Sequence, residues 1–168
     1  RNAGFVKTEG FDLDLTYRFE TDSMGAFNLT SQSTYVDNYE SRSTNDASGF
    51  TTKSVGFGGT FRLRSNFSAH WTYNDFGVTW GSRYYSSIRE SCFNAVAFPD
   101  ECNDPTYTAV NPAQTRATNV LGSNTFHDLQ VKWNAPWDAS ISVGANNIGE
   151  HEGPVLYSQP NANVNYYG

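Results

Sequence analysis

The residues best suited to chemistry in this 168-residue chain are its two cysteines, Cys92 and Cys102. They lie close together in a stretch that is rich in proline and acidic residues and has no regular hydrophobic pattern. An even number of cysteines without a second pair of metal ligands favours a disulfide. Zinc is the alternative, but no histidine lies between the cysteines to complete the usual ligand spacing. We therefore predict a Cys92–Cys102 disulfide that orders a loop, and we expect no bound metal and no cofactor.

The three histidines, His70, His127 and His151, do not form a metal or catalytic cluster by their spacing. A lone histidine is more often a satisfied structural residue than a ligand. The chain also shows no serine–histidine–aspartate arrangement, no phosphate-binding loop and no paired-carboxylate motif. We therefore expect that the protein is not an enzyme.

The composition indicates a β-rich fold in which aromatic residues replace aliphatic ones. The chain is 38% hydrophobic and 17% charged, with 12 Phe, 10 Tyr and 4 Trp. Leucine, alanine, glutamate and lysine dominate helical proteins, so an all-α fold is nearly excluded. The longest apolar run, residues 95–98, is far shorter than the ~20 residues that span a bilayer as a helix. A net charge of −6, without a cluster of basic residues, argues against nucleic acid as a partner.

Alternation of apolar and polar residues predicts six strands that pair into three hairpins. The hairpins join residues 11–19 to 27–39, residues 61–73 to 76–85, and residues 127–133 to 139–146. We expect the second hairpin to start at Phe61, with this side chain on the apolar face. The segments between the hairpins are expected to be loops. Alternation places on the polar face Asp12, Asp14, Arg18, Arg62, Arg64, His70, Arg83, Tyr85, Asp128 and Lys132.

The connections between these strands alternate strictly in length. Short connections are expected at residues 20–25, 74–75 and 135–138, and long ones at residues 40–53, 87–124 and from 147 onward. Large aromatic residues flank each short connection, as an interfacial aromatic belt requires. The predicted belt consists of Phe19, Phe27, Tyr73, Phe76, Trp133 and Trp137. These features favour an antiparallel transmembrane β-barrel over a soluble β-sandwich, a choice that periodicity alone leaves open.

Six strands are too few for a closed barrel, because the smallest single-chain barrels have about eight. An open edge in lipid would leave unpaired backbone groups, each at a cost of several kcal/mol. The chain also begins without an initiator methionine or a signal peptide. We therefore expect residues 1–168 to be part of one larger β-barrel domain.

Two sequence motifs in the third predicted hairpin are distinctive. They are residues 126–138, FHDLQVKWNAPWD, and residues 143–148, VGANNI. Both motifs resemble the C-terminal region of TonB-dependent outer-membrane receptors, as do residues 13–19, LDLTYRF. In that family, the penultimate hairpin commonly has an Asp-Leu-Gln strand, a short turn and a strand that ends in Gly-x-Asn-Asn-hydrophobic. The resemblance covers about residues 10–154.

The resemblance implies that the chain supplies about six late strands of a 22-stranded plugged barrel in the bacterial outer membrane. It also implies that the plug domain and the final strand lie outside this chain. The implied partners are outer-membrane lipid, the rest of the barrel with its plug, and a TonB-type energising protein that acts through the absent N-terminal region. The implied function is active uptake of a scarce nutrient, either a siderophore or an oligosaccharide.

Four residues are our candidates for ligand contact. Arg83 and Tyr85 are expected near the extracellular end of their strand, and Tyr107 and Tyr157 in long loops. Aromatic faces flanked by amides suit sugars or an aromatic siderophore. The mixed charges of the polar face suit hydrogen bonding to a plug and to a polar solute better than selection of one type of ion.

Two other functions are compatible with the sequence. A passive porin-like barrel has the same alternation of loop lengths but no plug domain. A secreted β-sandwich that binds carbohydrate has alternating strands too, but it turns their apolar faces inward. The two barrel functions therefore place the apolar side chains in lipid, whereas the sandwich buries them within the protein.

Overall fold

A computed structural model describes residues 4–42, 51–92, 102–104 and 118–153 of the chain. These residues form an all-β structure of antiparallel strands, which confirms the predicted fold class at that level. No helix among them is long and apolar enough to cross a membrane.

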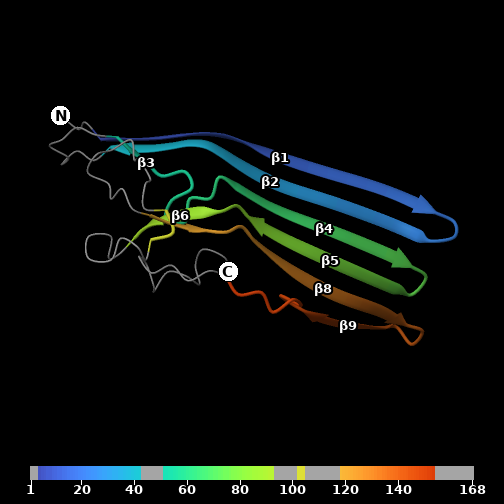
Figure 1. The fold of residues 1–168 in the computed structure, drawn as a ribbon. Coiled ribbons are helices and arrows are strands. Elements are labelled where there is room, and N and C mark those ends of the chain that lie inside the picture. Colours follow the sequence, from blue (N-terminus) through green and yellow to red (C-terminus); the bar gives the residue numbers. More distant parts are fainter. Residues whose placement is uncertain (1–3, 43–50, 93–101, 105–117, 154–168) are drawn as a thin grey trace.

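The main sheet has seven strands, and six of them follow one another in the order β1-β2-β4-β5-β8-β9 (Figure 1). The seventh, β3, pairs with the far end of β2. The bounds of these strands are β1 (Phe5–Thr21), β2 (Gly25–Arg42), β3 (Thr52–Lys53), β4 (Leu63–Tyr73), β5 (Phe76–Tyr85), β8 (Asn124–Ala135) and β9 (Ala139–Ala145). A separate two-stranded sheet consists of β6 (Ile88–Ser91) and β7 (Thr118–Leu121).

The three predicted hairpins are confirmed as the pairs β1–β2, β4–β5 and β8–β9. Their short turns all lie at the same end of the sheet, whereas β3 and β6 lie toward the opposite end (Figure 1). Gly25, Asn74 and Asp138 adopt positive φ angles of 83°, 49° and 59° at these turns. Glycine, asparagine and aspartate tolerate this left-handed conformation better than other residues do, which explains their places at tight turns.

The strand register gives the main sheet one apolar and one polar face, because residues directly opposite each other on paired strands point to the same side. One row on the apolar face consists of Tyr17, Leu29, Ala69, Trp80, Leu129 and Ala145. The adjacent row, on the polar face, consists of Arg18, Asn28, His70, Thr79, Gln130 and Gly144. The predicted separation of apolar and polar positions therefore extends across all six long strands.

The main sheet is open, with β1 and β9 at its two edges. Large side chains of the apolar face are solvent-exposed, including Leu13 at 47% and Val143 at 71%. A soluble sheet usually covers such a face with a second layer. The second sheet described here, β6–β7, instead contacts the polar face of the main sheet through a small hydrophobic core.

A small hydrophobic core joins the β6–β7 sheet to the main sheet. Ile88 of β6 is 1% exposed and packs with Phe61 and Phe126, while Tyr85 and Leu121 border this cluster. Tyr85 belongs to the polar-face row that contains Arg64. The expectation that residues 87–124 form only a loop is therefore wrong, because they contain β6 and β7, which fold against the polar face.

The predicted position of Phe61 is also wrong. Strand β4 begins at Leu63, and the ring of Phe61 lies 5.1 Å from the ring of Tyr85, on the polar side. The backbone carbonyl of Arg62 accepts a hydrogen bond from the amide of Val36, just before the regular pairing of β4 with β2 begins. The two-residue alternation therefore does not extend from β4 back to Phe61.

Candidate ligand-binding face

The polar face of the main sheet brings together most of the charged residues that alternation placed there. At the end near β6, one cross-strand row contains Asp12, Thr34, Arg64 and Tyr85. The next row contains Asp14, Gln32, Asn66 and Arg83. These two rows combine carboxylates, amides, hydroxyl groups, guanidinium groups and an aromatic ring on four adjacent strands.

A groove of about 470 Å³ lies over these two rows. Its lining residues are Asp12, Asp14, Gln32, Ser33, Thr34, Arg64, Asn66 and Tyr85. The side chains of Asp12, Asp14 and Arg64 form no hydrogen bond or ion pair with any other residue that the structure describes. Three charged groups therefore retain their hydrogen-bonding capacity for a solute in this groove, which we call the polar groove.

Arg83, a predicted ligand residue, is already held by the protein. Its Nε lies 3.3 Å from Oδ2 of Asp128, and its guanidinium carbon lies 5.5 Å from the centre of the Phe126 ring. Asp128 Oδ1 also accepts a hydrogen bond of 2.8 Å from the backbone amide of Asn147. Arg83 and Asp128 thus fix the end of β9 to β5 and β8, and Arg83 has less capacity for a ligand than Arg64 has.

The other predicted ligand residues differ in their placement. Tyr85 lines the polar groove, and its ring packs against Phe61 and lies 6.1 Å from the ring of Phe126. Tyr107 and Tyr157 lie outside the described residues. Of the four candidates, Tyr85 therefore has the clearest place at a possible ligand site.

At the short-turn end, two side chains of the polar face are held by hydrogen bonds to neutral neighbours. Arg18 Nε donates a hydrogen bond of 3.2 Å to Oδ1 of Asn28, and His70 Nδ1 shares one of 2.7 Å with the Thr79 hydroxyl. Lys132 pairs with Gly77 in the strand register, which keeps it on the same face. These contacts agree with the predicted face for Arg18, His70 and Lys132.

Arg62 is an exception to the predicted polar face. Its Nη1 lies 3.4 Å from the hydroxyl group of Tyr35 and 3.9 Å from Oδ1 of Asp37. The Tyr35 ring stacks on Phe11, at 5.1 Å between ring centres, on the apolar side of the sheet. Arg62 therefore lies on the side opposite to Arg64, because it precedes the regular part of β4.

Beyond the groove, the ends of β1 and β2 carry exposed ion pairs. Lys7 Nζ lies 2.7 Å from Oε1 of Glu9, and both side chains are about half exposed. The hydrogen bond between them raises the pKa of Lys7 and lowers the pKa of Glu9. Both groups precede the apolar alternation that starts at Phe11, so this end of the hairpin is suited to aqueous solvent.

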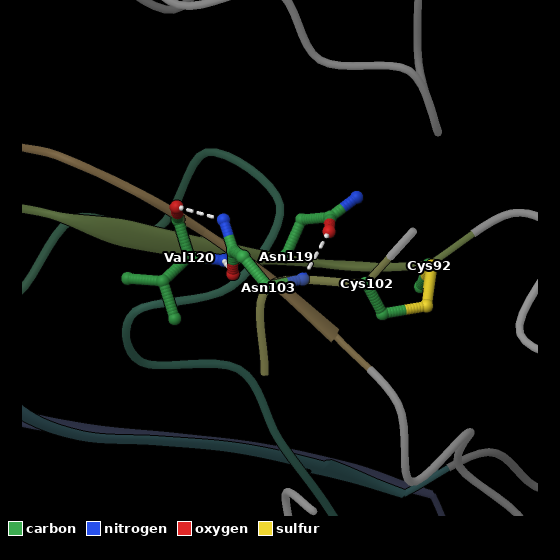
Figure 2. Close-up of a disulfide and its surroundings, with 5 residues drawn as sticks. All are labelled: Cys92, Cys102, Asn103, Asn119 and Val120. Atoms are coloured by element: carbon green, nitrogen blue, oxygen red, sulfur yellow. Dashed lines mark hydrogen bonds between the residues drawn. A yellow bond between two sulfur atoms is a disulfide. The ribbon is translucent and has the colours of Figure 1, made fainter. Parts of the chain in front are cut away.

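The predicted disulfide between Cys92 and Cys102 is confirmed, with Cα atoms 5.8 Å apart and both residues buried. It joins the end of β6 to the segment 102–104, which runs beside β7 (Figure 2). Asn103 extends this pairing with its side chain, because its amide donates to the carbonyl of Val120 and accepts from the Val120 backbone N–H. The disulfide thus closes a compact unit of three chain segments.

Arg89 adds a polar link within the same unit. Its guanidinium group pairs with Asp104 and donates a hydrogen bond of 3.1 Å to the Thr118 hydroxyl. Backbone hydrogen bonds in both directions also join Asp104 to Thr118. We call residues 88–92, 102–104 and 118–121 the clamped hairpin. Its disulfide was predicted from the sequence, but its two strands were not.

The predicted aromatic belt forms a nearly continuous band at the short-turn end of the apolar face. Rings of Phe19 and Phe27 stack at 4.7 Å, those of Phe76 and Trp133 at 6.5 Å, and Trp133 contacts Trp137 at 5.3 Å. Trp71, which the prediction omitted, links the two parts. It lies opposite Phe27 in the register and stacks at 6.3 Å on Tyr73, which pairs with Phe76. Its spacing of two residues from Tyr73 on the same strand was the available signal.

No group of three or more histidine, cysteine, aspartate or glutamate residues within the described part of the chain could hold a metal ion. No family model, curated protein or solved structure matches the chain. The candidate site therefore rests on its own geometry, which suits binding of a polar solute by hydrogen bonds.

Proposed function

We propose that this chain forms late strands of an outer-membrane β-barrel, in a TonB-dependent receptor that takes up a scarce nutrient. The observation that carries this proposal is the exposed apolar face, bordered at its short-turn end by the aromatic band. Lipid chains solvate such a face favourably, and aromatic rings concentrate at the interface between lipid and water. The polar face then lines the interior of the barrel.

The open edges of the sheet fit a larger barrel. Strands β1 and β9 each leave one side of their backbone unpaired by the other described strands. Unpaired backbone groups are costly in lipid, so a membrane-embedded sheet must close through additional strands. Supporting the receptor class, the motifs that resemble TonB-dependent receptors fall on β1, on β8 and its turn, and on the end of β9 with the three residues after it. In such a receptor, a plug domain fills the interior and the energising protein acts from the periplasm.

A passive porin-like channel is a second candidate because of the clamped hairpin. This hairpin packs against the polar face through Ile88, and it would narrow an open pore near the long-loop end. A plug domain in the same gene and dependence on the energising protein distinguish the receptor from this channel.

The soluble sandwich has less support. It needs a second layer over Leu13, Val143 and the other exposed apolar side chains, and no element described here provides one. The single face of apolar residues therefore fits lipid better than water.

Cysteine substitutions at two adjacent residues of β8 test the proposal directly. Val131 lies on the apolar face and Lys132 on the polar face, so Val131→Cys and Lys132→Cys form a matched pair. In native membranes, we expect Val131→Cys to react with a lipid-soluble reagent, and Lys132→Cys to react with a small water-soluble maleimide only. The proposal would be contradicted if Val131→Cys reacted with the lipid-soluble reagent no more than Lys132→Cys does, and if the protein purified without detergent.

A further inference from the structure

We propose that the polar groove binds a neutral polyhydroxylated solute, that is, a segment of an oligosaccharide. The proposed site consists of Asp12, Asp14, Arg64, Asn66 and Tyr85, with Gln32 and Thr34 between them. This inference rests on the proposed function, because it needs the polar face to line a solute pathway. It adds the class of solute and the residues that would bind it.

The dimensions of the groove suit an extended ligand. Asp12, Thr34, Arg64 and Tyr85 form a row across β1, β2, β4 and β5. Because neighbouring strands lie about 4.8 Å apart, the row spans roughly 14 Å. The parallel row that starts at Asp14 lies about 7 Å away along the strands. Hydrogen-bonding groups therefore cover an area larger than one sugar ring.

The chemistry of the lining selects a ligand that both donates and accepts hydrogen bonds. Ionised carboxylates accept only, so Asp12 and Asp14 suit the hydroxyl groups of a diol. Arg64 donates only, while Gln32 and Asn66 have both functions. Charge-assisted hydrogen bonds of this kind are stronger than neutral ones. None of the three charged groups has another partner among the described residues, so a solute need not displace any of these residues from them.

The charges of the groove disfavour anionic ligands and leave Arg64 without an acceptor when the ligand is a simple cation. Two carboxylates and one guanidinium group give the groove a net charge of about −1 at neutral pH. A phosphate or an anionic metal chelate would face the repulsion of both carboxylates, whereas an amine could pair with the carboxylates but would offer no acceptor to Arg64. A neutral polyol satisfies both signs without adding charge.

The clamped hairpin supports one wall of the groove. Tyr85 borders the polar groove, and its ring also packs against Phe61 in the cluster that contains Ile88. This packing fixes the ring at the end of the row, where the C–H face of a sugar ring can contact it. The site thus lies on regular strands. Packing against Phe61 already holds the Tyr85 ring in place, so binding does not have to order this side chain.

Binding measurements on the full-length protein in detergent test this inference. The ligands are neutral and sulfated oligosaccharides, presented on a glycan array, and spermine, measured in solution. We expect at least one neutral oligosaccharide to bind, and the double variant Asp12→Asn/Asp14→Asn to bind it at least tenfold more weakly. Arg64→Gln should weaken the same interaction independently, which keeps the test valid if the double variant folds poorly.

Glu20→Gln is the matched control. Glu20 lies on the same strand and the same face as Asp12 and Asp14, but near the short turn and outside the polar groove. Its substitution should leave sugar binding within twofold of wild type. The inference is overturned if no neutral oligosaccharide binds, if sulfated sugars or spermine bind more tightly, or if Glu20→Gln weakens binding as much as the groove variants. These outcomes leave the labelling of Val131→Cys, and thus the membrane proposal, unaffected.

Discussion

At the scale of single residues, Gly25 lies where the β1–β2 turn comes close to the backbone of β4. Its φ angle is 83°, and a Cβ atom there would lie 2.2 Å from the carbonyl oxygen of Thr72. We predict that Gly25→Ala lowers the free energy of unfolding by at least about 1–2 kcal/mol, from the backbone conformation alone. The measurement is denaturant unfolding of the protein in detergent micelles, followed by circular dichroism.

Gly122 provides the control for this prediction. A Cβ atom at Gly122 would meet nothing within 4 Å, and its φ angle is not in the left-handed region. Gly122→Ala should therefore unfold at the wild-type denaturant concentration. Equal stability of the two variants would contradict the close contact between the β1–β2 turn and β4.

Residues also show where alternation stops being informative. It placed Asp12, Arg64 and Asp128 correctly, because each lies inside a regular strand whose register fixes its face. It misplaced Phe61 and Arg62, which precede β4 and are positioned by a backbone hydrogen bond to Val36 and by packing against Tyr85. Those contacts join residues far apart in sequence, so no local pattern contains them.

At the scale of elements, the clamped hairpin depends on its disulfide more than the main sheet does. The bond closes a sequence separation of 10 residues, which corresponds to about 2–3 kcal/mol of stabilisation in the chain-entropy model. We predict that Cys92→Ser/Cys102→Ser increases amide hydrogen exchange in β6 and β7, while exchange in β4, β5 and the paired part of β8 stays unchanged. Mass spectrometry after exchange in micelles measures both regions at once.

A uniform increase across the main sheet would show that the hairpin and the sheet form one cooperative unit. Unchanged exchange in β6 and β7 would instead show that Asn103, Arg89 and the Ile88 core suffice without the disulfide. Either result contradicts the prediction of a locally clamped unit.

The elements that the sequence revealed are the long ones. Hairpins β1–β2, β4–β5 and β8–β9 each carry enough alternating residues to indicate a strand, with turn formers between them. Strands β6 and β7 have four residues each, IRES and TNVL, and their alternation is too short to recognise. Their pairing comes from the disulfide and from contact with Phe61 and Phe126, which only the assembled sheet brings together.

At the scale of the whole molecule, the proposed receptor and the passive channel differ in their need for energy. We predict that the organism takes up the solute bound in the polar groove only when its TonB-type energising protein is present. Deleting the gene for the receptor or the gene for the energising protein should each reduce uptake of a radiolabelled ligand at least about tenfold at low concentration. Uptake at that concentration without the energising protein would favour the channel.

The two edges of the sheet differ greatly in length, which affects the chain when it is produced alone. Strand β1 has 17 residues and β9 has 7, so β1 offers far more hydrogen bonds to a partner strand. Exposed edges template association between copies. Pairing of β1 with β1 is self-complementary and joins two copies about a twofold axis, whereas head-to-tail pairing of β1 with β9 repeats from copy to copy, into a ring if it closes and a fibre if it does not. During refolding of the isolated segment, β1–β1 pairing into a dimer therefore competes with repeated β1–β9 pairing. The greater length of β1 favours the dimer.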